Sequence, residues 1–140
     1  MCQPSTYEDM LLNEYLKENP GELYLEVPVY YLSKPSQARR IDGILIPGDK
    51  TEIFPHGSYS KEDLSQKIKG QKVHLLEAKN VLERYVVGQV LVGAMLLEKV
   101  FEPAEVIKVA VCGRGNPDIE YFCEHNNIKV ALYTIAEKGK

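Results

Sequence analysis

The chain has 140 residues, of which 44% are hydrophobic and 26% are charged, and its formal net charge is −3. This length and composition suit a single domain over residues 1–140, with a core that needs neither disulfides nor structural metals. The negative charge counts against a protein that binds its partners through an overall basic surface. No run approaches the roughly 18 consecutive apolar residues of a membrane span, and the chain does not begin with a secretory signal pattern.

The three cysteines, Cys2, Cys112 and Cys123, are an odd number without a close-spaced pair. A zinc site would need a Cys-x-x-Cys pair or a Cys/His cluster, and the sequence has neither. Cys112 lies in an apolar run and Cys123 in a predicted helix, so we expect both to be buried or half-buried. Because free thiols persist in a reducing compartment, the simplest expectation is a cytoplasmic protein.

The first part of the chain predicts a helix followed by two strands. Ser5 or Thr6 can cap the helix, and the Asn-Pro-Gly sequence at 19–21 ends it. Pro28 cannot donate to a β-ladder, so the first strand should lie at a sheet edge or carry a bulge. The predicted ranges are residues 5–18 for the helix, 23–31 for the first strand and 39–46 for the second.

The rest of the chain predicts the alternation of strands and helices that is typical of parallel sheets. The stretch 47–71 is the least regular, with a short helix between Ser60 and Gly70. A strand, a helix and a second strand form a right-handed crossover, so the strands at 72–79 and 106–112 should be parallel neighbours. The remaining predicted ranges are a strand at 72–79, a helix at 81–100, a strand at 106–112, a helix from Asn116 and a strand at 128–135.

Two charged side chains interrupt the apolar face of the strand at 72–79. Because side chains alternate along a strand, Glu77 and Lys79 share a face with Val73 and Leu75, and Ala78 points away. A buried charge is costly unless it is paired or bound to a metal. An acid-x-Lys triplet is a weak signal by itself, but its place at the end of the clearest strand makes both residues candidates for function.

Asp42 is the second candidate, because strand propensity disfavours an acid within the strand at 39–46. It shares a face with Ile44 and Ile46, and Gly43 beside it permits close approach of another backbone or of a ligand. If the strands at 39–46 and 72–79 pair, Asp42 can face Glu77, and two such carboxylates suit Mg²⁺ or Mn²⁺. The alternatives are a solvated strand-end pair for the Glu-x-Lys residues, and a turn cap or an arginine partner for Asp42.

An acid on one strand, Glu-x-Lys on the next and a helix that follows at once resemble the PD-(D/E)xK nuclease superfamily. The sequences Arg-Arg-Ile-Asp-Gly-Ile-Leu-Ile and Leu-Leu-Glu-Ala-Lys-Asn are similar to restriction-endonuclease-like and Holliday-junction-resolvase-like members, with Ile41 in place of a proline before the acid. The resemblance extends from the first helix to the strand at 106–112. It implies an α/β restriction-endonuclease-like fold, with a central mixed five-stranded sheet in the order αβββαβαβ, and a metal-dependent nuclease that hydrolyses phosphodiester bonds of DNA.

The resemblance also implies roles for individual residues. Asp42 and Glu77 would coordinate Mg²⁺ or Mn²⁺ together with the backbone carbonyl of Ala78, and Lys79 would orient or help deprotonate the attacking water. Members often add a glutamate from the first helix. Helical spacing favours Glu8, whose positions i+3, i+4 and i+7 are apolar or aromatic, and leaves Glu14 as the alternative. Gln89 is the last catalytic candidate, with simple helix packing as its alternative.

The expected partner is DNA, with no membrane. No second domain for sequence reading is visible, so recognition should depend on DNA structure or ends, on a homodimer or on a partner protein. Tyrosines such as Tyr30, Tyr31, Tyr59 and Tyr85 could stack on bases, although tyrosines usually pack in cores, and we expect a core or interface role for His74. The alternative function is a catalytically inactive nuclease-like module for nucleic-acid or protein binding and assembly. The candidates for binding DNA phosphates, which could instead form a solvated surface, are Arg39, Arg40, Lys67, Lys69, Lys72 and Arg84.

Overall fold

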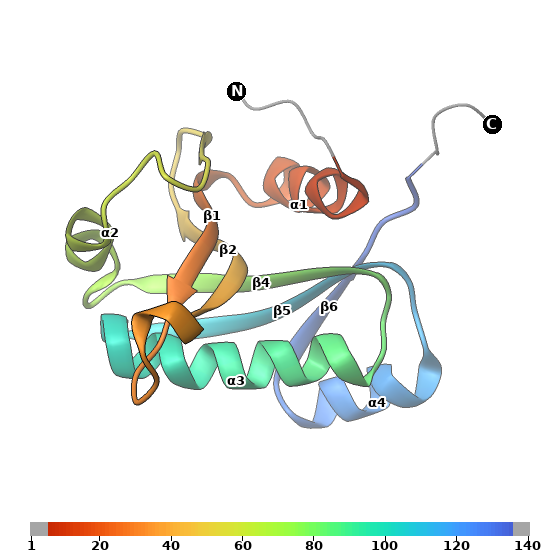
Figure 1. The fold of residues 1–140 in the computed structure, drawn as a ribbon. Helices are drawn as coiled ribbons and strands as arrows, with labels where there is room; N and C mark the ends of the chain where they lie inside the picture. Colours follow the sequence, from red (N-terminus) through yellow and green to blue (C-terminus); the bar gives the residue numbers. More distant parts are fainter. Residues whose placement is uncertain (1–5, 136–140) are drawn as a thin grey trace.

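The computed structural model describes residues 6–135, which form one mixed β-sheet with helices on both faces (Figure 1). In chain order the elements are α1 (Tyr7–Glu18), β1 (Gly21–Val29), the 3₁₀-helix η1 (Pro35–Gln37), β2 (Arg39–Pro47), β3 (Glu52–Phe54), α2 (Lys61–Ile68), β4 (Lys72–Val81), α3 (Arg84–Phe101), β5 (Glu105–Arg114), α4 (Pro117–His125) and β6 (Ile128–Leu132). The strand order in the sheet is β3-β1-β2-β4-β5-β6. β1 and β2 are antiparallel, as are β2 and β4, whereas β4, β5 and β6 are parallel, and this confirms the predicted crossover.

The sheet has six strands among the described residues, so the predicted count of five is wrong. The additional strand, β3, lies in the irregular stretch and pairs in parallel with the start of β1. Its Phe54 ring stacks on Tyr24 of β1, with ring centroids 4.6 Å apart and planes inclined by 7°. Three residues are too few for side-chain alternation to show in a sequence, and a tertiary contact holds this strand in place.

Several predicted boundaries also differ from those in the structure. β1 begins at Gly21 and ends at Val29, and β6 ends at Leu132. α3 begins at Arg84 and not at Val81, because Val81 still pairs with Arg114 of β5. The parallel ladder therefore extends into residues that the helical pattern alone would assign to α3.

Local predictions at the N-terminal end are confirmed. Thr6 caps α1, with its Oγ1 accepting a hydrogen bond from the Asp9 N–H at 3.0 Å. Ser5, the other predicted cap, and Cys2 lie outside the described residues. Pro28 stands opposite Arg40 of β2, but β3 pairs only with residues 22–24 of β1, so at Pro28 the other edge of β1 has no neighbouring strand, as a residue without an N–H favours.

The apolar core lies on both faces of the sheet. Leu11, Leu12 and Leu16 of α1 pack on one face, and α3 covers the other, with contributions from α2 and α4; Figure 1 shows α1 on the opposite side of the sheet from α3 and α4. His74 is half-buried on the α1 face, where its Nδ1 lies 2.7 Å from the Tyr15 hydroxyl, which confirms the expected core role. Cys112 and Cys123 are buried and free.

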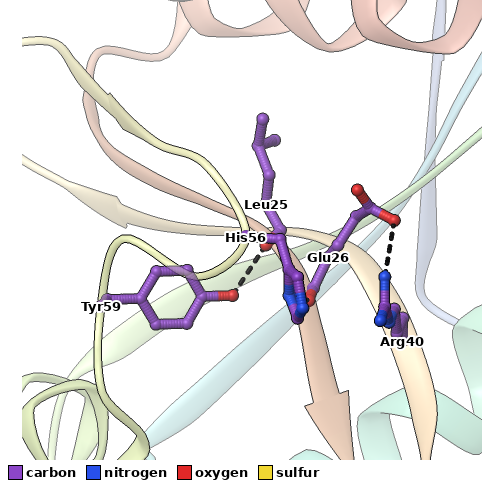
Figure 2. A network of polar contacts seen from close by, with 5 residues as sticks. All are labelled: Leu25, Glu26, Arg40, His56 and Tyr59. Atoms are coloured by element: carbon purple, nitrogen blue, oxygen red, sulfur yellow. Dashed lines mark hydrogen bonds and ion pairs between the residues drawn. The ribbon is translucent and has the colours of Figure 1, made fainter.

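The loop before α2 bonds to the backbone of β1 beyond the end of β3 (Figure 2). The Tyr59 hydroxyl donates to the Leu25 carbonyl at 2.7 Å, and His56 Nδ1 donates to the Glu26 carbonyl at 3.0 Å. The Glu26 carboxylate accepts from Arg40 of β2 at 3.4 Å. The loop therefore replaces a neighbouring strand along this part of β1.

Substitution of Tyr59 by phenylalanine should lower the free energy of unfolding by about 1 kcal/mol, because it removes one hydrogen bond to a backbone carbonyl and keeps the ring. Urea unfolding followed by circular dichroism measures this effect. Tyr85→Phe is the matched control, since the Tyr85 side chain is 64% exposed. Equal losses in the two variants would contradict a specific role for the Tyr59 hydroxyl.

Candidate functional site

Asp42 and Glu77 come together where β2 separates from β4. The antiparallel ladder between these strands ends at Gly43 and Leu76, so the next residues on the two strands are Asp42 and Glu77. Beyond this point the backbone of β2 is not paired with that of β4. The Asp42 carboxylate, in place of a backbone carbonyl, accepts the hydrogen bond from β4. Its Oδ2 accepts a hydrogen bond from the Ala78 N–H at 2.8 Å.

Glu26 on β1 marks an irregularity of the β1–β2 ladder next to Asp42. The sequence did not predict any role for this residue. It stands opposite Asp42 in the register and has a left-handed backbone, with φ of 48°, which is unusual for a residue other than glycine. The ladder contains the pair Leu25–Gly43 and the pair Val27–Ile41 but skips the position between them. Asp42 is therefore outside the regular ladder. The only signal in the sequence was an acid in an apolar strand close to Pro28.

Glu77 is the one buried charged residue of residues 6–135, with 2% of its surface exposed, and its Oε1 has no hydrogen-bond partner. Burial, together with repulsion by and hydrogen bonding to Asp42, raises the pKa of Glu77 from 4.5 to about 9. Burial also raises the pKa of Asp42, although the hydrogen bond from the Ala78 N–H opposes the change. An unsatisfied buried carboxyl next to a second one requires a proton or a cation.

These oxygen atoms fit a hard divalent cation. Asp42 and Glu77 contribute carboxylates from two strands, and the carbonyl of Ala78 points to the same edge of β4 as its N–H, which is the edge that faces Asp42. No three His, Cys, Asp or Glu residues between 6 and 135 gather into a metal-binding group. Mg²⁺ needs only one or two carboxylates when waters and phosphate oxygens complete its octahedron. The residues present therefore fit Mg²⁺ or Mn²⁺ with a phosphate ligand.

A cavity of about 260 Å³ lies between β2 and α3, with Glu77 in its wall. It is also lined by Arg39, Arg40 and Arg84, and Glu77 is the only acid among the lining residues. Arginine recognises phosphate through paired, charge-assisted hydrogen bonds. The cavity thus brings Glu77, one member of the carboxylate pair, together with three arginines, and we call it the arginine cavity.

Gly93 allows α3 to lie directly over Glu77. A Cβ atom at this position would meet Leu75 Cδ1 at 3.2 Å, Ile41 Cγ1 at 3.6 Å and Glu77 Oε2 at 3.8 Å. The contact with Leu75 would be tight, and those with Ile41 and Glu77 would be ordinary van der Waals contacts, so a side chain larger than a methyl group would meet the carboxylate. Sequence reasoning noted this glycine only as a neighbour of Gln89.

The other predicted catalytic residues occupy different positions around the cavity. Gln89 and Tyr85 of α3 line it, and the Lys79 ammonium lies 5.5 Å from the centroid of the Tyr85 ring. Glu8 lies on α1 and does not line the cavity, but its negative charge contributes to the raised pKa of Asp42. Glu14, the other candidate glutamate, pairs with Lys17 at 2.8 Å.

The structure divides the predicted DNA-binding residues into two groups. The three arginines gather at the cavity, and the three lysines do not. Lys67 pairs with Glu22 at 3.0 Å, Lys69 is exposed just after α2, and Lys72 begins β4 about 16 Å before Glu77 along the strand. The basic contribution to the site therefore comes from β2 and α3.

Comparison of the chain with protein families, with curated proteins and with solved structures gives no match. Among residues 6–135, no helix has the length and apolar character needed to cross a membrane.

Proposed function

We propose that this protein is a metal-dependent nuclease that hydrolyses phosphodiester bonds of DNA, and that its αβββαβαβ elements form a restriction-endonuclease-like core. The observation that carries the proposal is the Glu77 carboxyl, which is buried in the wall of the arginine cavity next to Asp42 and whose Oε1 has no hydrogen-bond partner. A carboxylate with a purely structural role is hydrogen-bonded when it is buried. A cation-binding carboxylate pair beside a phosphate-binding surface accounts both for the unsatisfied Glu77 oxygen and for the arginines that line the cavity.

The chemistry divides between the cation and the residues around it. A bound Mg²⁺ or Mn²⁺ would lower the pKa of a coordinated water and neutralise negative charge on the phosphate. Asp42, Glu77 and the Ala78 carbonyl would hold the ion, with Glu77 losing its proton on binding. Loss of that proton gives the site the negative charge that a divalent ion needs.

The arginines and Lys79 act on the substrate. Arg39, Arg40 and Arg84 would hold the phosphodiester in the cavity by charge-assisted hydrogen bonds. Lys79 is held over the Tyr85 ring, and its ammonium would orient the attacking water and stabilise the charge that grows on the phosphate in the transition state. The Gln89 amide lines the same cavity and is available to hold a water or a phosphate oxygen.

The distribution of charge supports a local mode of DNA binding. The net charge of −3 opposes binding through the whole surface, whereas three arginines at one cavity concentrate positive charge where a phosphate would lie. We propose that the protein works in the cytoplasm and recognises the structure or the ends of DNA, with a second copy or a partner protein adding specificity.

Substitution of Asp42 by asparagine tests the proposal. Asparagine keeps an oxygen that can accept from the Ala78 N–H, so the fold should survive, while the negative charge is lost. We expect wild type to bind Mn²⁺ at millimolar concentration or below by calorimetry and to cleave plasmid DNA with Mn²⁺ but not with EDTA. The variant should lose both properties.

Two results would reject the nuclease. Cleavage by Asp42→Asn at the wild-type rate would remove the carboxylate pair from the mechanism. Absence of Mn²⁺ binding to the wild type, with DNA still bound through the arginine cavity, would instead indicate the inactive binding module.

A further inference from the structure

A second cavity, of about 180 Å³, lies beside the turn that follows β1. Aromatic rings from three separate parts of the chain form much of its wall. Tyr30 directly follows β1, His56 and Tyr59 belong to the loop before α2, and Phe101 is the last residue of α3. We call it the hairpin pocket. A dry cavity of about 150 Å³ accommodates a ligand such as benzene, so this volume suits a single flat ring system.

Hydrogen bonds to β1 hold two of these rings in place. Tyr59 donates to the Leu25 carbonyl and His56 to the Glu26 carbonyl (Figure 2). Glu26 also contacts Arg40, which lines the arginine cavity. The same residues of β1 and β2 therefore connect the two cavities, and the rings are oriented before any ligand arrives.

Positive charge lies next to the aromatic surface. The Lys61 ammonium is 5.0 Å from the centroid of the Tyr30 ring, and the Lys99 ammonium is 5.9 Å from that of Tyr31, a side chain that is 53% exposed. Neither lysine forms an ion pair within residues 6–135. Aromatic rings beside unpaired cations are typical of surfaces that bind single-stranded nucleic acid, where bases stack and phosphates are neutralised.

The hairpin pocket is near the carboxylate pair. Gly93 lines the arginine cavity and Phe101 lines the hairpin pocket, and their separation of eight positions along α3 corresponds to about 12 Å. A strand with one phosphate in the arginine cavity could place a base in the hairpin pocket within a few nucleotides. The bases of an intact duplex are paired and stacked, so only an unpaired or flipped base could enter.

We propose that the hairpin pocket binds one unpaired nucleobase of the DNA strand whose phosphodiester lies at Asp42 and Glu77. This inference rests on the proposed nuclease function and specifies its substrate as single-stranded or locally unpaired DNA. Tyr30 stacks on the base, His56 and Tyr59 complete the pocket, and Lys61 neutralises an adjoining phosphate.

Binding of fluorescent DNA to the full chain in EDTA tests the inference without cleavage. The probes are a 12-nucleotide oligothymidine and a blunt 12-base-pair duplex, followed by fluorescence anisotropy. Tyr30→Ala should weaken binding of the single strand about tenfold, Tyr30→Phe should restore it, and duplex binding should be the same in all three proteins. His56→Ala should also weaken single-strand binding, which provides a second variant in case Tyr30→Ala unfolds.

Tyr121→Ala is the matched control. Tyr121 is also a partly exposed tyrosine beside a histidine, with its ring centroid 4.2 Å from that of His125, and it lines neither cavity. Its substitution should leave single-strand binding unchanged. Unchanged affinity in both Tyr30→Ala and His56→Ala, or tighter binding of the duplex than of the single strand by wild type, would overturn the inference.

The failure of this inference is distinguishable from the failure of the proposed function. Mn²⁺-dependent cleavage without any contribution from Tyr30 would leave the nuclease in place and remove the base pocket. Tyr30-dependent binding of single strands by a protein that cleaves no DNA with Mn²⁺ would retain the pocket and reject the nuclease.

Discussion

Replacement of Glu77 by glutamine should stabilise the metal-free protein and abolish metal-dependent cleavage. The pKa of Glu77 is about 9 in the folded chain and near 4.5 when the side chain is in water. Folding therefore takes up a proton at neutral pH. Each pH unit above 4.5 costs about 1.4 kcal/mol until the folded pKa is reached, which amounts to about 3 kcal/mol at pH 7.

The sign of this effect gives the expected pH profile. The contribution of Glu77 to stability is complete below pH 4.5 and is lost progressively as the pH rises toward 9, because the unfolded chain ionises first. In EDTA the wild type should therefore lose stability across this range, and Glu77→Gln should lose much less. At pH 7 the variant should be more stable by about 2 kcal/mol, since the unpartnered amide offsets part of the gain.

Urea unfolding at several pH values, with and without Mn²⁺, measures these quantities. Mn²⁺ should raise the unfolding midpoint of the wild type and not that of Glu77→Gln. Glu22→Gln is the control. The Tyr24 hydroxyl and Lys67 lower the pKa of Glu22, so its loss should reduce stability slightly at pH 7 and leave the response to Mn²⁺ intact. A wild-type profile that rises from pH 5 to 9 in EDTA would contradict a protonated Glu77.

Replacement of Lys79 by methionine should reduce the rate of cleavage about 10²- to 10³-fold while Mn²⁺ binding is retained. Methionine keeps much of the apolar stem and removes the ammonium that lies over the Tyr85 ring. A positive charge next to the reacting phosphate stabilises the transition state more than the bound substrate, so kcat should fall and KM should change little. Single-turnover cleavage at saturating Mn²⁺ measures the effect.

Lys129→Met is the matched control for Lys79→Met. The Lys129 ammonium also lies over a tyrosine ring, 4.8 Å from the centroid of Tyr15, but on the α1 face of the sheet. Both substitutions remove a lysine from a cation–π contact, and Lys129→Met also removes a hydrogen bond from Lys129 Nζ to the Tyr15 hydroxyl at 3.3 Å, so its cost in stability should be at least as large. Equal losses of cleavage in the two variants would indicate that Lys79 acts through folding and not at the phosphate.

Side-chain periodicity and short-range signals in the sequence determined the secondary structure and much of the sheet. The apolar run at 106–112 and the long helix before it predicted the parallel β4–β5 pair, because only a crossover can join two such strands. Alternation along β4 also placed Glu77 and Lys79 on one face with Val73 and Leu75, and the structure shows that α3 covers this face. The strand β3 could not be predicted, because Phe54 stacking on Tyr24 holds it and three residues carry no pattern.

The sequence by itself nominated Asp42, Glu77 and Lys79, because charged residues in apolar strands are costly and visible in the pattern. Tertiary structure decided that the two carboxyls meet, since this depends on where β2 leaves β4 and on the left-handed backbone of Glu26. It also decided that arginines and not lysines line the cavity, and that Gly93 brings α3 close to Glu77. Burial and charge repulsion act through space between residues distant in sequence, so no local pattern could show that Oε1 of Glu77 is buried without a hydrogen-bond partner.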